Sequence, residues 1–178
     1  REFEKTQSKK TMFYEDSIVF NREEFATRIY MTIAGLHGEY LKHPENADTL
    51  VTAWGKLYKK SLILENDASF INTKEIGTED ALFNLSVLKT VNCVYIKKYF
   101  NHYRKNNSAS LTSTYKPNLR TQWKKLFKYM HPILASSERR DDLLGALNNR
   151  IGLSIIGLGL NALALPNKEA LREIRSIL

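Results

Sequence analysis

Residues 77–89 read Gly-Thr-Glu-Asp-Ala-Leu-Phe-Asn-Leu-Ser-Val-Leu-Lys, and this stretch decides how the rest of the chain must fold. Thr78 stands where an N-cap residue would, and a helix is predicted from Glu79 to about Lys89. Its apolar residues lie nearly all the way round the helix: Leu82, Phe83, Leu85, Val87 and Leu88. A helix that is apolar on every side is stable when it is buried, so other elements must cover it.

Two helices and a short strand are predicted before this stretch. The first helix begins after Asn21, because Asn21 and Glu24 form a capping-box pattern, and Gly35 stands where a C-cap glycine would. The second is predicted to begin near Asp48, with its apolar side chains on one face: Leu50, Trp54, Leu57 and Tyr58. Residues 69–72 are predicted as a short strand.

After the central helix the pattern changes from extended to helical. Residues 91–104 are rich in Val, Ile, Tyr and Phe and predict one or two short strands. Pro117 can open a helix with one apolar face: Leu119, Trp123, Leu126, Phe127 and Met130. A further helix is predicted from about Glu138, with these residues in register: Leu144, Leu147, Ile151, Ile155 and Leu158. Pro166 ends it, and Asn167 can cap a last helix. The predicted fold class is therefore α+β, dominated by helices.

Composition fits a globular chain and excludes several classes of protein. The chain has 178 residues, with 43% apolar and 26% charged residues, which suits one domain, or one domain with a small appendage. A single cysteine, Cys93, excludes a disulfide scaffold and a cysteine-based zinc site. The nearly apolar run 151–165 is shorter than the roughly 20 residues of a membrane-spanning helix. No signal peptide is recognisable, and the missing initiator Met predicts a piece of a longer protein.

The net charge of +8 is concentrated in residues 97–137, which contain no Asp or Glu. Its basic residues are Lys97, Lys98, Arg104, Lys105, Lys116, Arg120, Lys124, Lys125 and Lys128. In the predicted helix, Arg120, Lys124 and Lys128 follow one another at i, i+4 spacing and form a ridge. The segment is predicted to face phosphates of a nucleotide or nucleic acid, or an acidic membrane surface. The alternative is a solvated helix face.

Several short motifs carry no function. Residues 157–162 match the dinucleotide fingerprint G-x-G-x-x-A, but only 16 residues follow, too few for the rest of a βαβ unit. The four histidines lack i, i+3 or i, i+4 spacing, so a helix-borne metal site is not predicted. Ser61 and Ser110 lack a G-x-S-x-G setting, and there is no P-loop.

The acidic pair Glu79-Asp80 is the sharper signal. Carboxylates in the first turn of a helix are stabilised by the helix dipole and the free N–H groups, so the pair could be only a cap. The alternative is a carboxylate that a buried helix holds at the edge of a cleft, where it accepts a proton from a substrate hydroxyl. The local sequence leaves both interpretations open.

Three segments, taken in order, resemble motifs of bacterial family 2 glycosyltransferases. Residues 53–61, Ala-Trp-Gly-Lys-Leu-Tyr-Lys-Lys-Ser, resemble the family's W-N-K-L-Y-K-R-S segment. Residues 77–84 resemble its G-E-D-x-x-F segment. Tyr95-Ile96, then His102-Tyr103-Arg104 and Ser110-Leu111-Thr112, resemble Y-I-x-x-x-L-Y-x-Y-R-x-x-x-x-S-L-T. The resemblance covers roughly residues 48–115, with looser support from residue 1.

This resemblance implies half of a GT-A fold and an inverting transfer from a nucleotide-sugar donor. Residues 1–115 would form the acceptor-side half of the catalytic domain, and residues 116–178 a basic and apolar helical tail. Asp80 would be the catalytic base and Glu79 would orient the acceptor. Trp54 and Lys56 would bind the acceptor or sugar, although Trp54 could equally be a core residue. The diphosphate would lie against the loop that contains His102, Tyr103, Arg104 and Ser110.

The sequence also departs from the family. The N-terminal nucleotide-binding strands are missing, no Asp-x-Asp metal motif occurs, and Gly55 replaces the usual Asn. The Mg²⁺ or Mn²⁺ of the family would therefore belong to a longer enzyme, with His102 as a candidate ligand there, and the 178 residues alone are expected to be inactive. We expect no metal site within this chain.

The resemblance and the charge pattern also predict partners and location. We expect a cytoplasmic protein, peripheral at the inner face of the cytoplasmic membrane, acting in polysaccharide and cell-envelope synthesis. The basic residues of the tail would dock on anionic lipid: Lys116, Arg120, Lys124, Lys125 and Lys128. Alternatively the tail packs on the catalytic part or on a second copy, and the chain self-associates. A non-catalytic module that binds a polyanion through residues 97–137 is the alternative function, although nucleic-acid motifs are missing.

Overall fold

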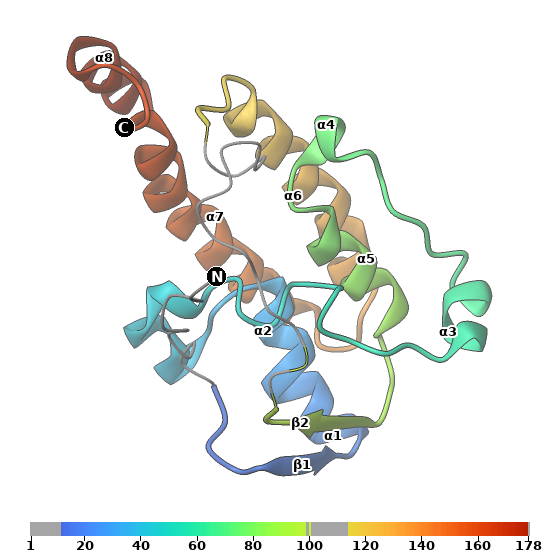
Figure 1. Cartoon of the computed structure of the whole chain (residues 1–178). Helices are drawn as coiled ribbons and strands as arrows, with labels where there is room; N and C mark the ends of the chain where they lie inside the picture. The colour runs from blue at the N-terminus through green and yellow to red at the C-terminus, as the bar shows by residue number, and fades with distance from the viewer. Residues whose placement is uncertain (1–11, 99, 101–113, 178) are drawn as a thin grey trace, which may run out of the picture.

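The computed structural model describes residues 12–98, 100 and 114–177 (Figure 1). Within these residues the chain is mainly helical and has one small antiparallel sheet of two strands, so the α+β, helix-dominated class is confirmed. The elements in chain order are β1 (Ser17–Phe20), α1 (Arg22–Phe25), the π-helix η1 (Ala26–Tyr30), α2 (Met31–Ala34), the 3-10 helices η2 (Gly38–Lys42) and η3 (Pro44–Asn46), α3 (Lys60–Glu65), α4 (Thr73–Ile76), α5 (Glu79–Val87), β2 (Cys93–Ile96), α6 (Leu119–Ala135), α7 (Arg140–Ala162) and α8 (Asn167–Ile177).

The first predicted helix is present and begins at the predicted capping box. The Asn21 side chain accepts a hydrogen bond from the Glu24 backbone N–H, and the Glu24 carboxylate accepts one from the Asn21 N–H. From there α1, η1 and α2 follow without a break to Ala34. Gly35 is the C-cap, but its φ of 171° is extended rather than left-handed. A Cβ at Gly35 would lie 1.9 Å from the Ala146 carbonyl oxygen, so the glycine permits close contact between α2 and α7.

The two strands pair β1 with β2 in antiparallel register, from Ser17 opposite Ile96 to Phe20 opposite Cys93. Phe20 is fully buried, whereas Val19 and Val94 are exposed. One face of this ribbon therefore covers the core. The extended structure predicted for residues 91–104 is confirmed for 93–96; residues 99 and 101–104 lie outside the described part of the chain.

Helix α5 occupies the centre of the molecule, as the sequence predicts. Its apolar residues Leu82, Phe83 and Leu85 are buried, and it packs against α2 on one side and α6 on another. Thr78 is at the N-cap position, but its φ is +48° and its side chain does not cap the helix. Instead the Thr78 hydroxyl accepts a hydrogen bond of 3.3 Å from the Trp123 indole N–H.

The C-terminal helices form an α6–α7 hairpin that closes the core. Helix α6 buries Leu126, Met130 and Leu134 and packs on α4 and α5, while α7 packs on α2. The tail therefore packs on the first part of the chain, and residues on both sides of position 115 share one core. The division into two domains remains a prediction. In Figure 1, α7 runs past the core and α8 follows at its end.

Two local predictions are wrong. Residues 48–58 form turns rather than a helix, and the helix in this region is α3 at Lys60–Glu65. Residues 69–72 are irregular, and Phe70 stacks on Phe83 with ring centroids 4.1 Å apart instead of joining a sheet. The helix predicted from about Glu138 is present as α7; on it Ile151 and Ile155 are exposed, whereas Leu158 beyond them is buried.

Candidate active site

The candidate site is built around the first turn of α5, where the acidic pair lies. Gly77 and Thr78 both have positive φ, 55° and 48°, and Thr78, with a ψ of 42°, takes the left-handed helical conformation just before the helix. For Thr this conformation costs about 1–2 kcal/mol. This turn sets the direction in which α5 begins. Glu79 and Asp80, in the first turn of the helix, are half-buried. Strain of this kind at a non-glycine residue is typical of sites where geometry matters more than stability.

Lys56 and Asp80 are near enough for the charge of Asp80 to act on Lys56, although their side chains form no ion pair with each other. The Lys56 ammonium donates hydrogen bonds of 2.8 Å to the Leu50 carbonyl and 2.5 Å to the Thr52 carbonyl. Burial lowers the pKa of Lys56 to about 8, and the charge of Asp80 partly opposes this shift. The structure therefore brings a carboxylate and an ammonium into one electrostatic neighbourhood from positions 24 residues apart in the chain.

Asn84 and Tyr58 belong to the same cluster, and the sequence analysis missed both. The Tyr58 hydroxyl donates a hydrogen bond of 2.7 Å to the Asn84 side-chain oxygen. The Asn84 amide donates to the Val51 carbonyl at 2.7 Å and to the Asp80 carbonyl at 2.8 Å. Burial, with a smaller contribution from the charge of Asp80, raises the pKa of Tyr58 well above its usual value. The signal in the sequence was a polar residue, Asn84, inside an otherwise apolar helix and four positions after Asp80.

Cys93 completes the cluster on the side of β2. Burial raises the pKa of its thiol above the ordinary value of 9.0, although the charge of Lys56 acts in the opposite direction. The thiol is therefore protonated at neutral pH and is a poor nucleophile. The cluster of Lys56, Tyr58, Asp80, Asn84 and Cys93, named the Asp80 cluster below, offers one carboxylate beside one cation.

A cavity of about 780 Å³ opens next to this turn, between α4, the start of α6 and the end of α7. Gly77, Thr78 and Trp123 line it, together with Lys74 and Lys116. The Gln122 amide, which also lines it, donates to the Lys74 carbonyl at 2.8 Å and so ties α6 to α4. The cavity thus adjoins the residues immediately before the acidic pair and is roomy enough for a sugar unit.

The remaining predicted residues are placed differently. Trp54 lies in residues 48–58, called the turn segment below, and is 61% exposed. The alternative that it is a core residue is therefore wrong. His102, Tyr103, Arg104 and Ser110 lie outside the described residues. Within the described ranges, no group of three or more His, Cys, Asp or Glu side chains is arranged to hold a metal ion. The described residues therefore do not fit the metal that the resemblance implies.

The chain was compared with known protein families, with curated proteins and with solved structures, and none of the three comparisons found a match.

Proposed function

We propose that this chain is the acceptor-side half of an inverting glycosyltransferase with a GT-A fold. It would move a sugar from a nucleotide-sugar donor to a hydroxyl of a glycan or lipid-linked acceptor in cell-envelope polysaccharide synthesis. The observation that carries the proposal is the Asp80 carboxylate, held by a buried helix and interacting with Lys56. A general base must be fixed within reach of its proton, and a rigid buried helix supplies that support.

In this proposal Asp80 accepts the proton of the acceptor hydroxyl while the oxygen attacks the anomeric carbon. The nucleoside diphosphate leaves from the opposite face of the sugar, so the configuration inverts. Glu79 orients the acceptor, and the cavity lined by Gly77 and Thr78 would hold the part of the acceptor next to the reacting hydroxyl, because Glu79 and Asp80 do not line that cavity. Arg104 of the phosphate-side loop neutralises charge on the leaving group.

The donor half of the site is expected from sequence outside these 178 residues, because the chain contains no Asp-x-Asp motif. The intact mass of the native gene product tests this first. A mass of about 30 kDa or more, with an Asp-x-Asp in the added part, supports the proposal. A native mass near 20.6 kDa, or sugar transfer by the 178 residues alone, would contradict it.

Replacement of the base tests the chemistry in the native gene product. Asp80→Asn should lower kcat by about 10²–10⁴-fold, the usual contribution of a general base, with little change in the KM for the donor. The measurement is release of the nucleoside diphosphate with a panel of nucleotide sugars. Asp67→Asn is the matched control, because Asp67 is exposed and its φ of 44° suits Asn. Equal loss in both variants, or a loss below tenfold in Asp80→Asn, would refute the assignment.

A further inference from the structure

The second half of α7 presents an apolar surface that the rest of the described chain leaves open. No charged residue occurs between Arg150 and Lys168. Side chains along this half are 40–65% exposed: Ile151, Ile155, Ile156 and Leu160. By length and composition α7 is the one described helix that could cross a membrane, with 22% of its most apolar window buried. Its first half, however, holds Leu143 and Leu147 in the core, so in this fold α7 lies against the protein body.

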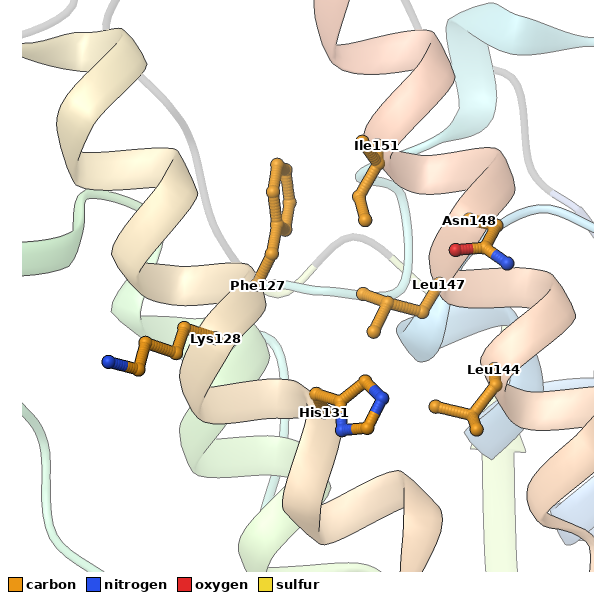
Figure 2. Close-up of a pocket in the computed structure, with 7 residues that line it drawn as sticks. All are labelled: Phe127, Lys128, His131, Leu144, Leu147, Asn148 and Ile151. Carbon is orange, nitrogen blue, oxygen red and sulfur yellow. The ribbon is translucent and has the colours of Figure 1, made fainter.

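A groove of about 490 Å³ between α6 and α7 joins this apolar surface to the basic helix. In Figure 2, Phe127 and His131 point from α6 toward α7, and Leu144, Leu147 and Ile151 face them. Lys128 also lines the groove, and in Figure 2 its side chain points from α6 away from α7 toward the surface. The floor is therefore apolar and the α6 rim is basic.

The basic residues of α6 continue this rim along the helix. Arg120, Lys124 and Lys128 are spaced by four residues and are all exposed, and α6 contains no Asp or Glu. The two helices run antiparallel, since Trp123 of α6 meets Gly157 of α7 while Phe127 and Ile151 line the groove. Lys124 consequently lies level with Ile155. A row of cations on α6 runs beside a row of exposed isoleucines on α7.

We propose that this face of the α6–α7 hairpin binds the surface of a bilayer that contains anionic phospholipid. Such a surface presents phosphates above an apolar layer, which matches a cationic row beside an apolar row. A nucleic acid would pair with the lysines but would leave the isoleucines in water. A second copy in a two-fold dimer would bring the α6 cations close to their own equivalents. Charge complementarity therefore favours lipid.

Vesicle sedimentation tests the electrostatic part of the proposal. Binding to neutral vesicles of phosphatidylcholine is compared with binding to anionic vesicles made of phosphatidylcholine and phosphatidylglycerol in equal amounts. The chain should bind the anionic vesicles at low salt and release in high salt. Lys124→Gln with Lys128→Gln should weaken binding about 30-fold, because each lysine near such a surface contributes about a factor of five. Lys59→Gln with Lys60→Gln, an equal charge change at exposed positions near α3, should leave binding unchanged within about twofold.

Ile151→Ser with Ile155→Ser tests the apolar part and should weaken binding at least about tenfold, since each side chain loses its burial in the interface. Leu57→Ser with Leu64→Ser is the matched control, because both leucines are highly exposed outside this face. Circular dichroism checks that each variant is folded.

Equal binding by the lysine pair and its control, or no binding to anionic vesicles, would overturn the proposal. A dimer in solution that Ile151→Ser with Ile155→Ser dissociates would also overturn it. So would oligonucleotide binding that Lys124→Gln with Lys128→Gln abolishes, if the two serine substitutions leave vesicle binding unchanged. None of these measurements depends on sugar transfer, so lipid binding and the proposed glycosyltransferase activity succeed or fail separately.

Discussion

Asn84 is the residue on which the geometry of the Asp80 cluster depends. It is fully buried, and its amide group joins three parts of the chain: Tyr58, Val51 and the backbone of Asp80. Without it the Val51 carbonyl and the Tyr58 hydroxyl would lose these partners, whereas the Asp80 carbonyl would keep its helical bond within α5. A buried amide with three good hydrogen bonds fixes one arrangement of its neighbours. The first turn of α5 is thereby tied to the turn segment that contains Lys56.

Asn84→Ala should lower the free energy of unfolding by about 2–4 kcal/mol, because it removes a buried side chain and the partner of the Tyr58 hydroxyl and of the Val51 carbonyl. Urea denaturation followed by circular dichroism measures this. Asn66→Ala is the control: Asn66 is exposed, and its amide makes one hydrogen bond, to the Leu62 carbonyl. That variant should change stability by less than about 1 kcal/mol. Similar values for the two variants would mean that the buried network contributes little.

Lys56 predicts a dependence of stability on pH. Burial lowers its pKa in the folded chain to about 8, from an ordinary value of 10.5. Between these values the unfolded chain binds the proton more fully than the folded chain, so this lysine makes stability rise with pH, by up to about 1.4 kcal/mol per pH unit. The rise should be absent in Lys56→Met. Urea unfolding of both proteins at pH 7.5, 8.5 and 9.5 measures the difference, and parallel curves would contradict the assignment.

At the scale of the elements, the contact between α2 and α7 depends on Gly35. Gly35→Ala would place a methyl group 1.9 Å from the Ala146 carbonyl oxygen, so the two helices must separate. We expect a loss of about 3 kcal/mol or more in the free energy of unfolding. Gly145→Ala, next to this contact on α7, meets no atom within 4 Å and should stabilise the chain by up to about 1 kcal/mol. Thermal unfolding of the two variants should therefore shift in opposite directions.

The elements that could be predicted are those whose signals are local. The capping box at Asn21 and the apolar run of α5 are each determined by residues close together in the sequence. The structure contains both the capping box and the helix. The apolar residues of 48–58 have helical spacing, but no helix forms there, because backbone carbonyls of this segment accept hydrogen bonds from side chains instead. The carbonyls of Leu50 and Thr52 accept from the Lys56 side chain, and that of Val51 accepts from Asn84. Side-chain donors replace the helical bonds, and no local pattern reveals this.

The candidate site could be predicted only in part for the same reason. The place of Asp80 at the start of an apolar helix left a capping role open, so resemblance to family motifs singled out both Asp80 and Lys56. Tyr58 and Cys93 have no local signal, because they join the site only through packing of α5 against the turn segment and β2. Their contribution depends on contacts between segments far apart in the sequence, which periodicity does not report.

At the scale of the whole molecule, Arg150 of α7 joins the C-terminal half of the chain to the end of α2 and to residues 47–48. Its guanidinium is 10% exposed and donates to the carbonyls of Ile33, Ala34 and Ala47, and it pairs with Asp48 at 2.9 Å. The last carbonyls of α2, which have no partner within their own helix, are thus satisfied by a side chain of α7. A helix in the C-terminal half of the chain therefore supplies the hydrogen-bond donors that the end of α2 lacks.

Arg150→Met should therefore lower the free energy of unfolding by about 3 kcal/mol or more, since buried carbonyls lose a charged donor. Arg140→Met is the control, because Arg140 is exposed and its ion pair with Asp141 is 3.5 Å long; it should cost less than about 1 kcal/mol. Unfolding in urea should remain one transition in the wild type when fluorescence and circular dichroism are compared. Two separated transitions would instead show that residues 1–115 and 116–178 unfold independently.

The Arg150 contacts also set an order of events when the chain is made. The carbonyls of Ile33 and Ala34 meet a guanidinium that lies 117 and 116 residues further on. A ribosome that adds about 5–20 residues per second needs roughly 6–23 s to reach it. During that interval the apolar side of α2 has emerged without its partner and is available to chaperones. The closing of this core is therefore a late event, timed by translation of α7.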